Sequence, residues 1–226
     1  MAMKGIKNIS ALLIFASTLL FVGCGNINIK EKNNAPQKWF ENVYELSEEL
    51  TSLAVGGGID VIVDTALAKN TMLLHANTDD FSKLVIKVED GKMEVSQKRG
   101  VIFKEYKLYV PSFDYKVVAV SGGADFEWDY CNVDELAVAA SGGADCEIKG
   151  RCNTLKVAAS GGADVDFEEL IAGEVSVVAS GGADVELHAV RTISLTASGG
   201  ADVYVNGTPQ ISSWSVSGGA DVHIEK

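Results

Sequence analysis

The sequence predicts an all-β protein built as a parallel β-helix, a solenoid with coils of about 19 residues and an irregular cap at its N-terminal side. Three observations predict this fold. The motif Ser-Gly-Gly-Ala-Asp occurs six times, at intervals of 18 to 20 residues. Apolar and polar residues alternate around the copies, which is typical of extended chain with one buried face. The arm around each motif keeps its length, whereas the segments between arms vary, as a stack of coils requires.

Residues 1–23 are predicted to be a signal peptide. Two lysines precede an uncharged, largely apolar run over residues 9–22, which is shorter than the roughly 20 residues that a membrane-spanning helix needs. The run ends in Phe21-Val22-Gly23-Cys24, which resembles the lipobox of bacterial lipoproteins, although those proteins usually carry Leu where Phe21 stands. The resemblance implies that Cys24 becomes the first residue of the mature protein, after the signal peptide is removed, and carries a lipid such as palmitate. The alternative is an ordinary secretory signal with an incidental cysteine.

Residues 24–39 are predicted to be a polar tether, and residues 40–226 a single domain. The chain has 226 residues, of which 47% are hydrophobic, so it can bury a sizeable core. Its net charge is −12, and loss of the two lysines in residues 1–23 makes it more negative still. A nucleic-acid partner is therefore unfavourable. A lipid on Cys24 would instead hold the domain at a membrane.

The regular coils are predicted over residues 116–226. In the second arm, Leu136, Val138 and Ala140 share one face with Ala144, while Asp145 and the other interleaved polar residues lie on the opposite face. The Gly-Gly pair in mid-arm indicates a bend between two strands, and the connectors between arms are expected to protrude as loops. The copies begin at Ser121, Ser141, Ser160, Ser180, Ser198 and Ser217.

Residues 40–115 are predicted to form the less regular capping part of the domain. Strands are expected over 43–63, 72–77, 84–88, 93–97 and 106–110. Asp90-Gly91 indicates a hairpin between two of them. An antiparallel sandwich or barrel is the alternative fold, but it gives an identical motif no reason to stack.

Together these residues resemble the putative auto-transporter adhesin, head GIN domain family. The features that carry the resemblance are Gly58-Ile59-Asp60-Val61, the hairpin over 88–95 and the recurrent Ser-Gly-Gly-Ala-Asp-Val arms. It covers about residues 40–226, with Asp60 where the family name has Asn. The resemblance implies a β-helical envelope protein, secreted or lipid-anchored, and brings no catalytic residues with it.

Stacked coils would place like side chains in columns. Calcium between coils is one hypothesis for the acidic column, because hard carboxylate oxygens suit that ion; its ligands would be Asp145, Asp164, Asp184 and Asp202. The alternative is that each aspartate accepts backbone N–H bonds at the glycine bend. The sequence suggests no other cofactor, since it contains no phosphate-binding loop and no cluster of metal-ligating residues at a recognised spacing.

Four further residues are candidates for chemistry. Cys131 and Cys152 lie in successive connectors and can either form a disulfide or remain free thiols. Tyr130 and Tyr204 are the expected ligand-contacting aromatics. The serine column lacks a recurring base, so nucleophilic catalysis is not expected. Trp128 and Trp214 are expected in the core.

The sequence predicts a non-enzymatic envelope lipoprotein that presents a rigid surface for adhesion or partner binding, with a glycan or another envelope protein as its ligand. The expected location is the outer membrane, on either its periplasmic or its surface face. A polysaccharide-active enzyme and a purely structural spacer are the alternatives. Charged and polar residues on the final coil, His223, Glu225 and Lys226, predict a monomer.

Overall fold

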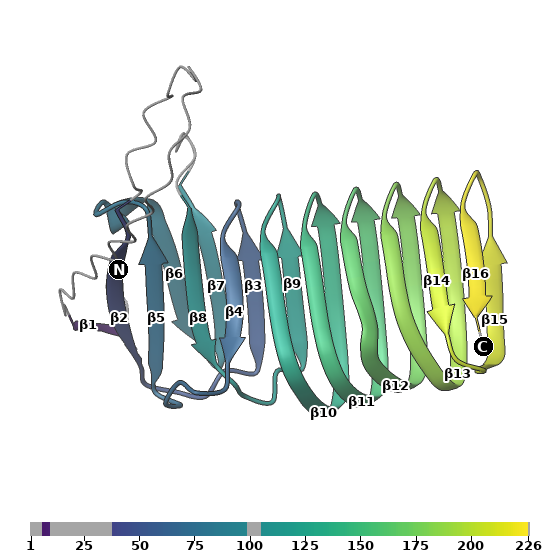
Figure 1. Ribbon diagram of the computed structural model, residues 1–226, viewed down its shortest axis with the longest axis horizontal. Coiled ribbons are helices and arrows are strands. Elements are labelled where there is room, and N and C mark those ends of the chain that lie inside the picture. Colours follow the sequence, from purple (N-terminus) through teal and green to yellow (C-terminus); the bar gives the residue numbers. More distant parts are fainter. Residues whose placement is uncertain (1–5, 10–37, 99–104, 226) are drawn as a thin grey trace, which may run out of the picture.

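The fold is that of a computed structural model, which describes residues 6–9, 38–98 and 105–225. Cys24 and nearly all of the predicted tether lie outside the described residues. The molecule is a stack of β-coils that runs from the N-terminal side to the C-terminal side (Figure 1). No described residue belongs to an α-helix, and no helix in the described chain is suited in length and hydropathy to cross a membrane.

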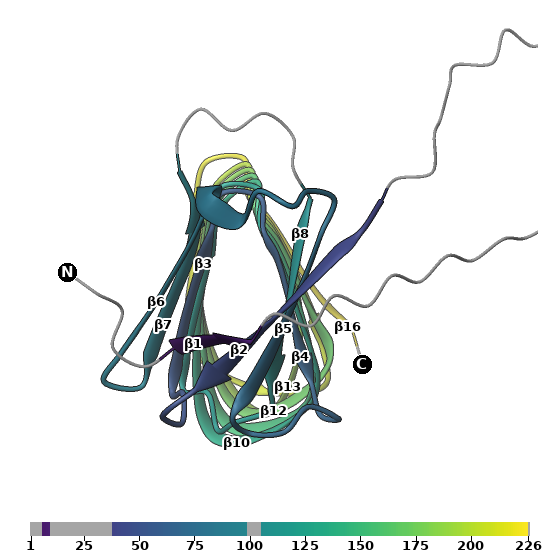
Figure 2. The ribbon, with the colours of Figure 1, turned by 90° about the vertical axis from the view of Figure 1, so that its left-hand side faces the viewer.

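Four long strands form the middle of the stack, and they pair in parallel with their neighbours. They are β10 (Asp125–Gly142), β11 (Asp145–Gly161), β12 (Asp164–Gly181) and β13 (Asp184–Gly199). Each strand descends one side, curves round the base and ascends the other side (Figures 1 and 2). The last coil is completed by β14 (Asp202–Asn206), β15 (Gln210–Val216) and β16 (Asp221–Glu225). The parallel solenoid predicted from the repeats is confirmed.

Four of the five connectors do not protrude as loops, which corrects the expectation from sequence; only between β14 and β15 does the described chain leave the strand, at residues 207–209. In β10 to β13 they continue the strand round the base of the coil. The register shifts there, between Trp128 and Cys131 in β10 and between Glu147 and Gly150 in β11. A β-bulge accommodates an extra residue without breaking the ladder, so connectors of different length still stack.

The glycine bend carries the ladder round the opposite corner. Gly161 and Gly181 have φ of 79° and 81°, a region that suits glycine because it has no Cβ. The N–H of Gly182 donates to the carbonyl of Gly161 at 2.7 Å, and the N–H of Asp184 donates to the carbonyl of Ala163 at 3.0 Å. Successive bends are thus bonded to one another, and the turn is part of the stack.

The core is wedge-shaped in cross-section, with the two sheets converging at the glycine bends (Figure 2). Fully buried alanines occupy the narrow end, at Ala144, Ala163, Ala183 and Ala201. Larger side chains such as Trp128 and Phe167 are buried toward the base. The increase in the size of the buried residues from the glycine bend to the base therefore follows the local distance between the sheets.

The N-terminal part combines coils with an antiparallel cap. Its elements are β1 (Ile6–Ile9), β2 (Phe40–Leu46), β3 (Ser52–Gly56), β4 (Asp60–Asp64), β5 (Thr71–Ala76), the 3₁₀ turn η1 (Phe81–Lys83), β6 (Leu84–Glu89), β7 (Lys92–Gln97), β8 (Tyr106–Pro111) and β9 (Val117–Ser121). Parallel pairing reaches back through β9 and β4 to β3, β7 and β8. Antiparallel β1, β2, β5 and the β6–β7 hairpin then close the stack. The hairpin turns at Asp90-Gly91, as predicted.

Candidate binding face

Two columns of acidic side chains lie on the outer surface of one sheet. The first column is aligned residue on residue: Asp125, Asp145, Asp164, Asp184, Asp202 and Asp221. The second holds Glu127, Glu147, Asp166 and Glu186 and ends in Tyr204 and His223. We call these two columns the carboxylate face. The stacking of Asp145 on Asp164, on which the acidic columns depend, is confirmed.

The carboxylate face is hollowed over β10 to β13. The depression has a volume of about 390 Å³. Its lining is formed by seven carboxylates and by two residues with buried side chains, and consists of Asp125, Phe126, Glu127, Asp145, Cys146, Glu147, Asp164, Asp166 and Glu186. Because every charged residue of this lining is acidic, a ligand that occupies the depression must supply positive charge or protons.

Burial, and after it the neighbouring carboxylates, raise the pKa of several acidic side chains on this face. Desolvation is the largest cause for the raised pKa of Asp164, and the neighbouring charges of Asp145 and Asp184 add to it. The pKa values of Asp125 and Glu186 are raised in the same way, by desolvation first and by neighbouring acids second. The face therefore carries unfavourable like-charge interactions that a bound cation would relieve.

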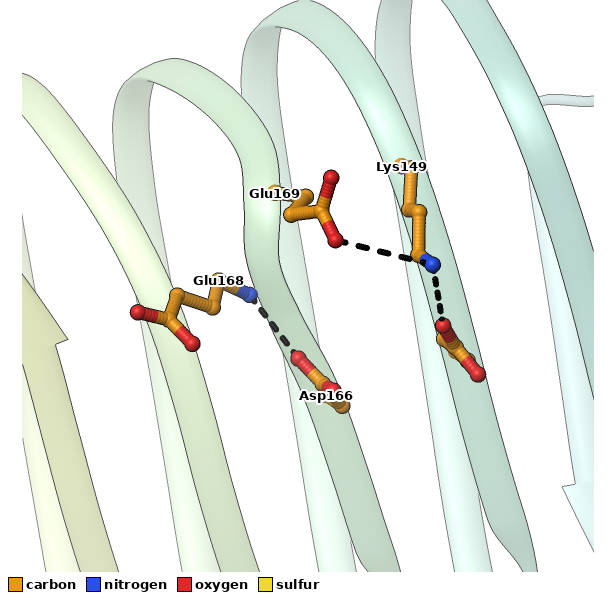
Figure 3. A network of polar contacts seen from close by, with 5 residues as sticks. Lys149, Asp166, Glu168 and Glu169 are labelled. Carbon is orange, nitrogen blue, oxygen red and sulfur yellow. Dashed lines mark hydrogen bonds and ion pairs between the residues drawn. The ribbon is translucent and has the colours of Figure 1, made fainter.

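One lysine lies beside the second column and partly compensates its charge. Lys149 Nζ is 2.7 Å from Glu147 Oε1 and 3.5 Å from Glu169 Oε1 (Figure 3). Its hydrogen bond to Glu147 is the largest cause of the raised pKa of the lysine. In the same view the N–H of Glu168 donates to Asp166 Oδ1 at 3.1 Å. The sequence did not indicate this lysine, because its position is occupied by other residues in neighbouring coils.

A second compensating pair lies at the N-terminal end of the face. Lys107 Nζ is 3.5 Å from Asp60 Oδ2, and the Asp60 charge acts on Asp125. Asp60 thus extends the aspartate column toward the cap. Gly58-Ile59-Asp60 is one of the features that carry the family resemblance, but it lies far from the first full copy of the motif, so the sequence did not place Asp60 in the column.

Stability should depend on pH through Asp164. A carboxyl whose pKa is raised in the folded state binds its proton more tightly there, so this group favours folding more as pH falls from neutral through that raised pKa toward the unfolded value near 4. Asp164→Asn removes the effect. We expect the gain in Tm between pH 7 and pH 4.5 to be smaller, or the loss larger, in Asp164→Asn than in the parent. Identical pH dependence of Tm in both proteins would contradict the assignment.

The two candidate tyrosines are not brought together. Tyr204 lies in the second column, where its ring stacks on His223 with centroids 5.2 Å apart, and it is next to Glu186 by register. Tyr130 lies at the bulge of β10 with φ of 64° and is largely exposed. Tyr204 is therefore part of the carboxylate face, whereas Tyr130 lies outside the residues that line its depression.

Cys131 and Cys152 are free thiols in this structure, and both are buried. The bulge pairs Cys131 with Gly150 and Val133 with Cys152, so the two cysteines are out of register. Burial raises the pKa of Cys131 to about 12 and that of Cys152 to about 11, which leaves both thiols protonated and unreactive near neutral pH. Of the two alternatives, the register favours free thiols, and a disulfide would require it to shift.

The serines of the motif also form a column. Ser121, Ser141, Ser160, Ser180 and Ser198 align along the other sheet. His188 and His223 align with Asn206 and Tyr204 and not with these serines, so neither histidine recurs beside the serine column as a base.

Within residues 38–98 and 105–225, no three acidic, histidine or cysteine side chains form a group that could hold a metal ion. Calcium between Asp145, Asp164, Asp184 and Asp202 remains a prediction, and those aspartates also follow the glycine bends.

The chain is similar to one protein family and to several solved structures. A family model described as "Putative auto-transporter adhesin, head GIN domain" matches residues 49–209. A solved "putative adhesin" from Bacteroides fragilis has a TM-score of 0.65 at 16% identity, with 84% of this chain and 98% of that one covered. A "putative lipid binding protein" from Parabacteroides distasonis has a TM-score of 0.47 at 15% identity, with coverages of 82% and 97%. No curated protein matches the chain.

Proposed function

Because the chain belongs to the family described as "Putative auto-transporter adhesin, head GIN domain", we propose that it is a non-enzymatic adhesin of the cell envelope whose carboxylate face binds a basic polypeptide. The family and the relative from Bacteroides fragilis are described as putative adhesins and not as enzymes. The observation that carries the proposed binding mode is the hollow lined by seven carboxylates. A partner with several lysines or arginines matches that charge.

The stacking geometry suits repeated weak contacts. Coils of a β-ladder repeat at about 4.8 Å, and the aspartates are aligned from coil to coil without a gap. The ladder fixes the backbone that carries the carboxylates, so no backbone conformational entropy needs to be lost there when a ligand binds. Several weak ion pairs on one rigid surface then add to a useful affinity.

An oligolysine peptide with a fluorescent label tests the proposal. We expect the double variant Asp164→Asn with Glu186→Gln to bind the peptide several-fold more weakly, since each exposed ion pair contributes about 0.5 kcal/mol. The matched control is Glu135→Gln with Glu174→Gln. These glutamates align with Thr154 on the opposite sheet, and both double variants change the net charge equally.

The measurement is fluorescence anisotropy at low and moderate salt. Equal weakening in the two double variants would show that only net charge matters and would overturn the assignment to the carboxylate face. Added calcium chloride distinguishes the ion hypothesis: if calcium occupies the aspartate column, it should displace the peptide from the parent protein at concentrations where magnesium does not.

The proposed anchor is the lipid on Cys24, which would place the domain on the outer membrane. Cys24→Ala is expected to abolish labelling by radioactive palmitate and to move the protein from the membrane to the soluble fraction. Cys146→Ala is the matched control, because Cys146 is buried in the core and its loss should leave labelling unchanged. Labelled Cys24→Ala protein would contradict lipidation at this residue.

A further inference from the structure

The last coil leaves its inward side chains uncovered. Ile211, Trp214 and Val216 of β15 are 49%, 43% and 37% exposed, and Ile224 of β16 is 37% exposed. Their register partners one coil earlier are Ile193, Leu195, Ala197 and Val205, and each of these is at most 1% exposed. Trp214 therefore points inward, as predicted, but it is not in the core, because no coil in the described chain covers it.

The backbone at this end is also unpaired. In the described chain, β15 pairs with β13 alone and β16 pairs with β14 alone. At the opposite end of the stack, the cap covers the first coils, and Leu53 and Val55 of β3 are buried. An apolar core section rimmed by free backbone N–H and C=O groups is a template for another strand pair.

The charges on this end are distributed unequally between its two strands. The outward residues of β16 include Asp221, His223 and Glu225, whereas β15 carries no charged residue between Gln210 and Val216. Pairing β16 with a second β16 in antiparallel fashion would oppose Asp221 to Glu225 and so would be repulsive. Pairing β16 with β15 of another molecule opposes acidic side chains to serines and avoids that repulsion.

We propose that this open coil binds the same coil of a second copy of the chain, tail to tail. The twofold axis lies in the plane of the coil and passes through the glycine bend. Since β15 and β16 run in opposite directions (Figure 1), this axis places β15 of each molecule antiparallel to β16 of the other. The same surface is used on both molecules, which closes the assembly as a dimer.

The wedge-shaped section supports the same axis. Rotation about it puts the narrow glycine end of one coil on the narrow end of the other, and the apolar side chains Ile211, Trp214 and Ile224 of both copies meet in one continuous core. A twofold axis perpendicular to the strands, in the same plane, would instead place the narrow end of one coil on the wide base of the other. It would also pair β16 of one molecule with β16 of the other. A head-to-tail filament would have to displace the antiparallel cap, so dimerisation ends the stack.

The test is the mass of the full chain in solution, by size-exclusion chromatography with light scattering. The chain is expressed without lipidation, and the Cys24→Ser variant is run beside it to exclude a disulfide through that residue. We expect twice the chain mass of 23.9 kDa, falling to a monomer in Trp214→Lys. The matched control is Val178→Lys, since this outward side chain of β12 is exposed to a similar extent, lies two strands away from β15 and should leave the dimer intact.

Circular dichroism of both lysine variants checks that the coil stack is retained, and Ile224→Lys serves as a second variant at the same surface. A monomer for the parent at micromolar concentration would overturn the proposal, and so would a dimer that persists in folded Trp214→Lys and Ile224→Lys. Masses that grow with concentration beyond two chains would indicate open-ended stacking and would overturn it as well. The inference is independent of the carboxylate face and is opposed to the prediction of a monomer, so the same measurement decides between them.

Discussion

Gly181→Ala is expected to destabilise the protein by about 3 kcal/mol. An alanine at a φ of 81° costs about 1 to 2 kcal/mol from its own backbone strain. Its Cβ would also lie 2.8 Å from the carbonyl oxygen and 2.9 Å from the nitrogen of Gly161, and neither backbone atom can move without disturbing the adjacent bend. Urea denaturation followed by circular dichroism measures the change.

Gly182→Ala is the matched control for this prediction. The two glycines are adjacent in the same motif, but a Cβ at Gly182 would meet only the carbonyl oxygen of Gly161 at 3.7 Å, an ordinary contact, and its φ is not in the left-handed region. We expect Gly182→Ala to shift the free energy of unfolding by less than about 1 kcal/mol. Equal destabilisation by the two alanines would show that the bend is not held by the stacking of Gly181 on Gly161.

Phe167→Ala is expected to destabilise by about 3 to 5 kcal/mol, the usual range for removing a buried aromatic ring. Phe167 is fully buried in the middle of the stack and aligns with Leu187, which is also fully buried. Neighbouring coils are fixed by their own ladders, so they cannot close on the cavity. The free energy of unfolding from urea titration, compared with the parent at equal m-value, gives the result.

Phe167→Leu provides the graded comparison. Leucine already occupies the register position in the next coil, so this change should cost less than about 1.5 kcal/mol. A cost for Phe167→Ala no larger than that for Phe167→Leu would mean that the base of the coil is loosely packed, contrary to the burial seen there. Retained far-ultraviolet circular dichroism distinguishes local loss from collapse of the stack.

The solenoid and its columns could be predicted from sequence because one motif recurs with its alternation intact. Asp145 and Asp164 hold the same position in consecutive copies of the motif, so parallel stacking predicts that they lie next to each other, as they do. The family resemblance followed from the same residues together with the Gly58-Ile59-Asp60 segment, and the match to residues 49–209 confirms it.

What the sequence did not predict depends on residues that break the repeat. The bulges that replace the expected loops arise where connector lengths differ, and the alternation of apolar and polar residues does not predict bulges. Lys149 occurs in one coil only, so no column marked it as a partner of Glu147. The exposure of Trp214 depends on whether another coil covers it, and the alternation of apolar residues is the same in covered and uncovered coils.

The bulged base of each coil has a consequence for how such molecules vary in length. Each middle coil touches chiefly the one before and the one after it, and the base tolerates unequal spacing. Duplication or deletion of one motif would lengthen or shorten the stack of coils by about 4.8 Å without changing the contacts within the other coils. The distance from the cap to the last coil can thus change in steps of one motif.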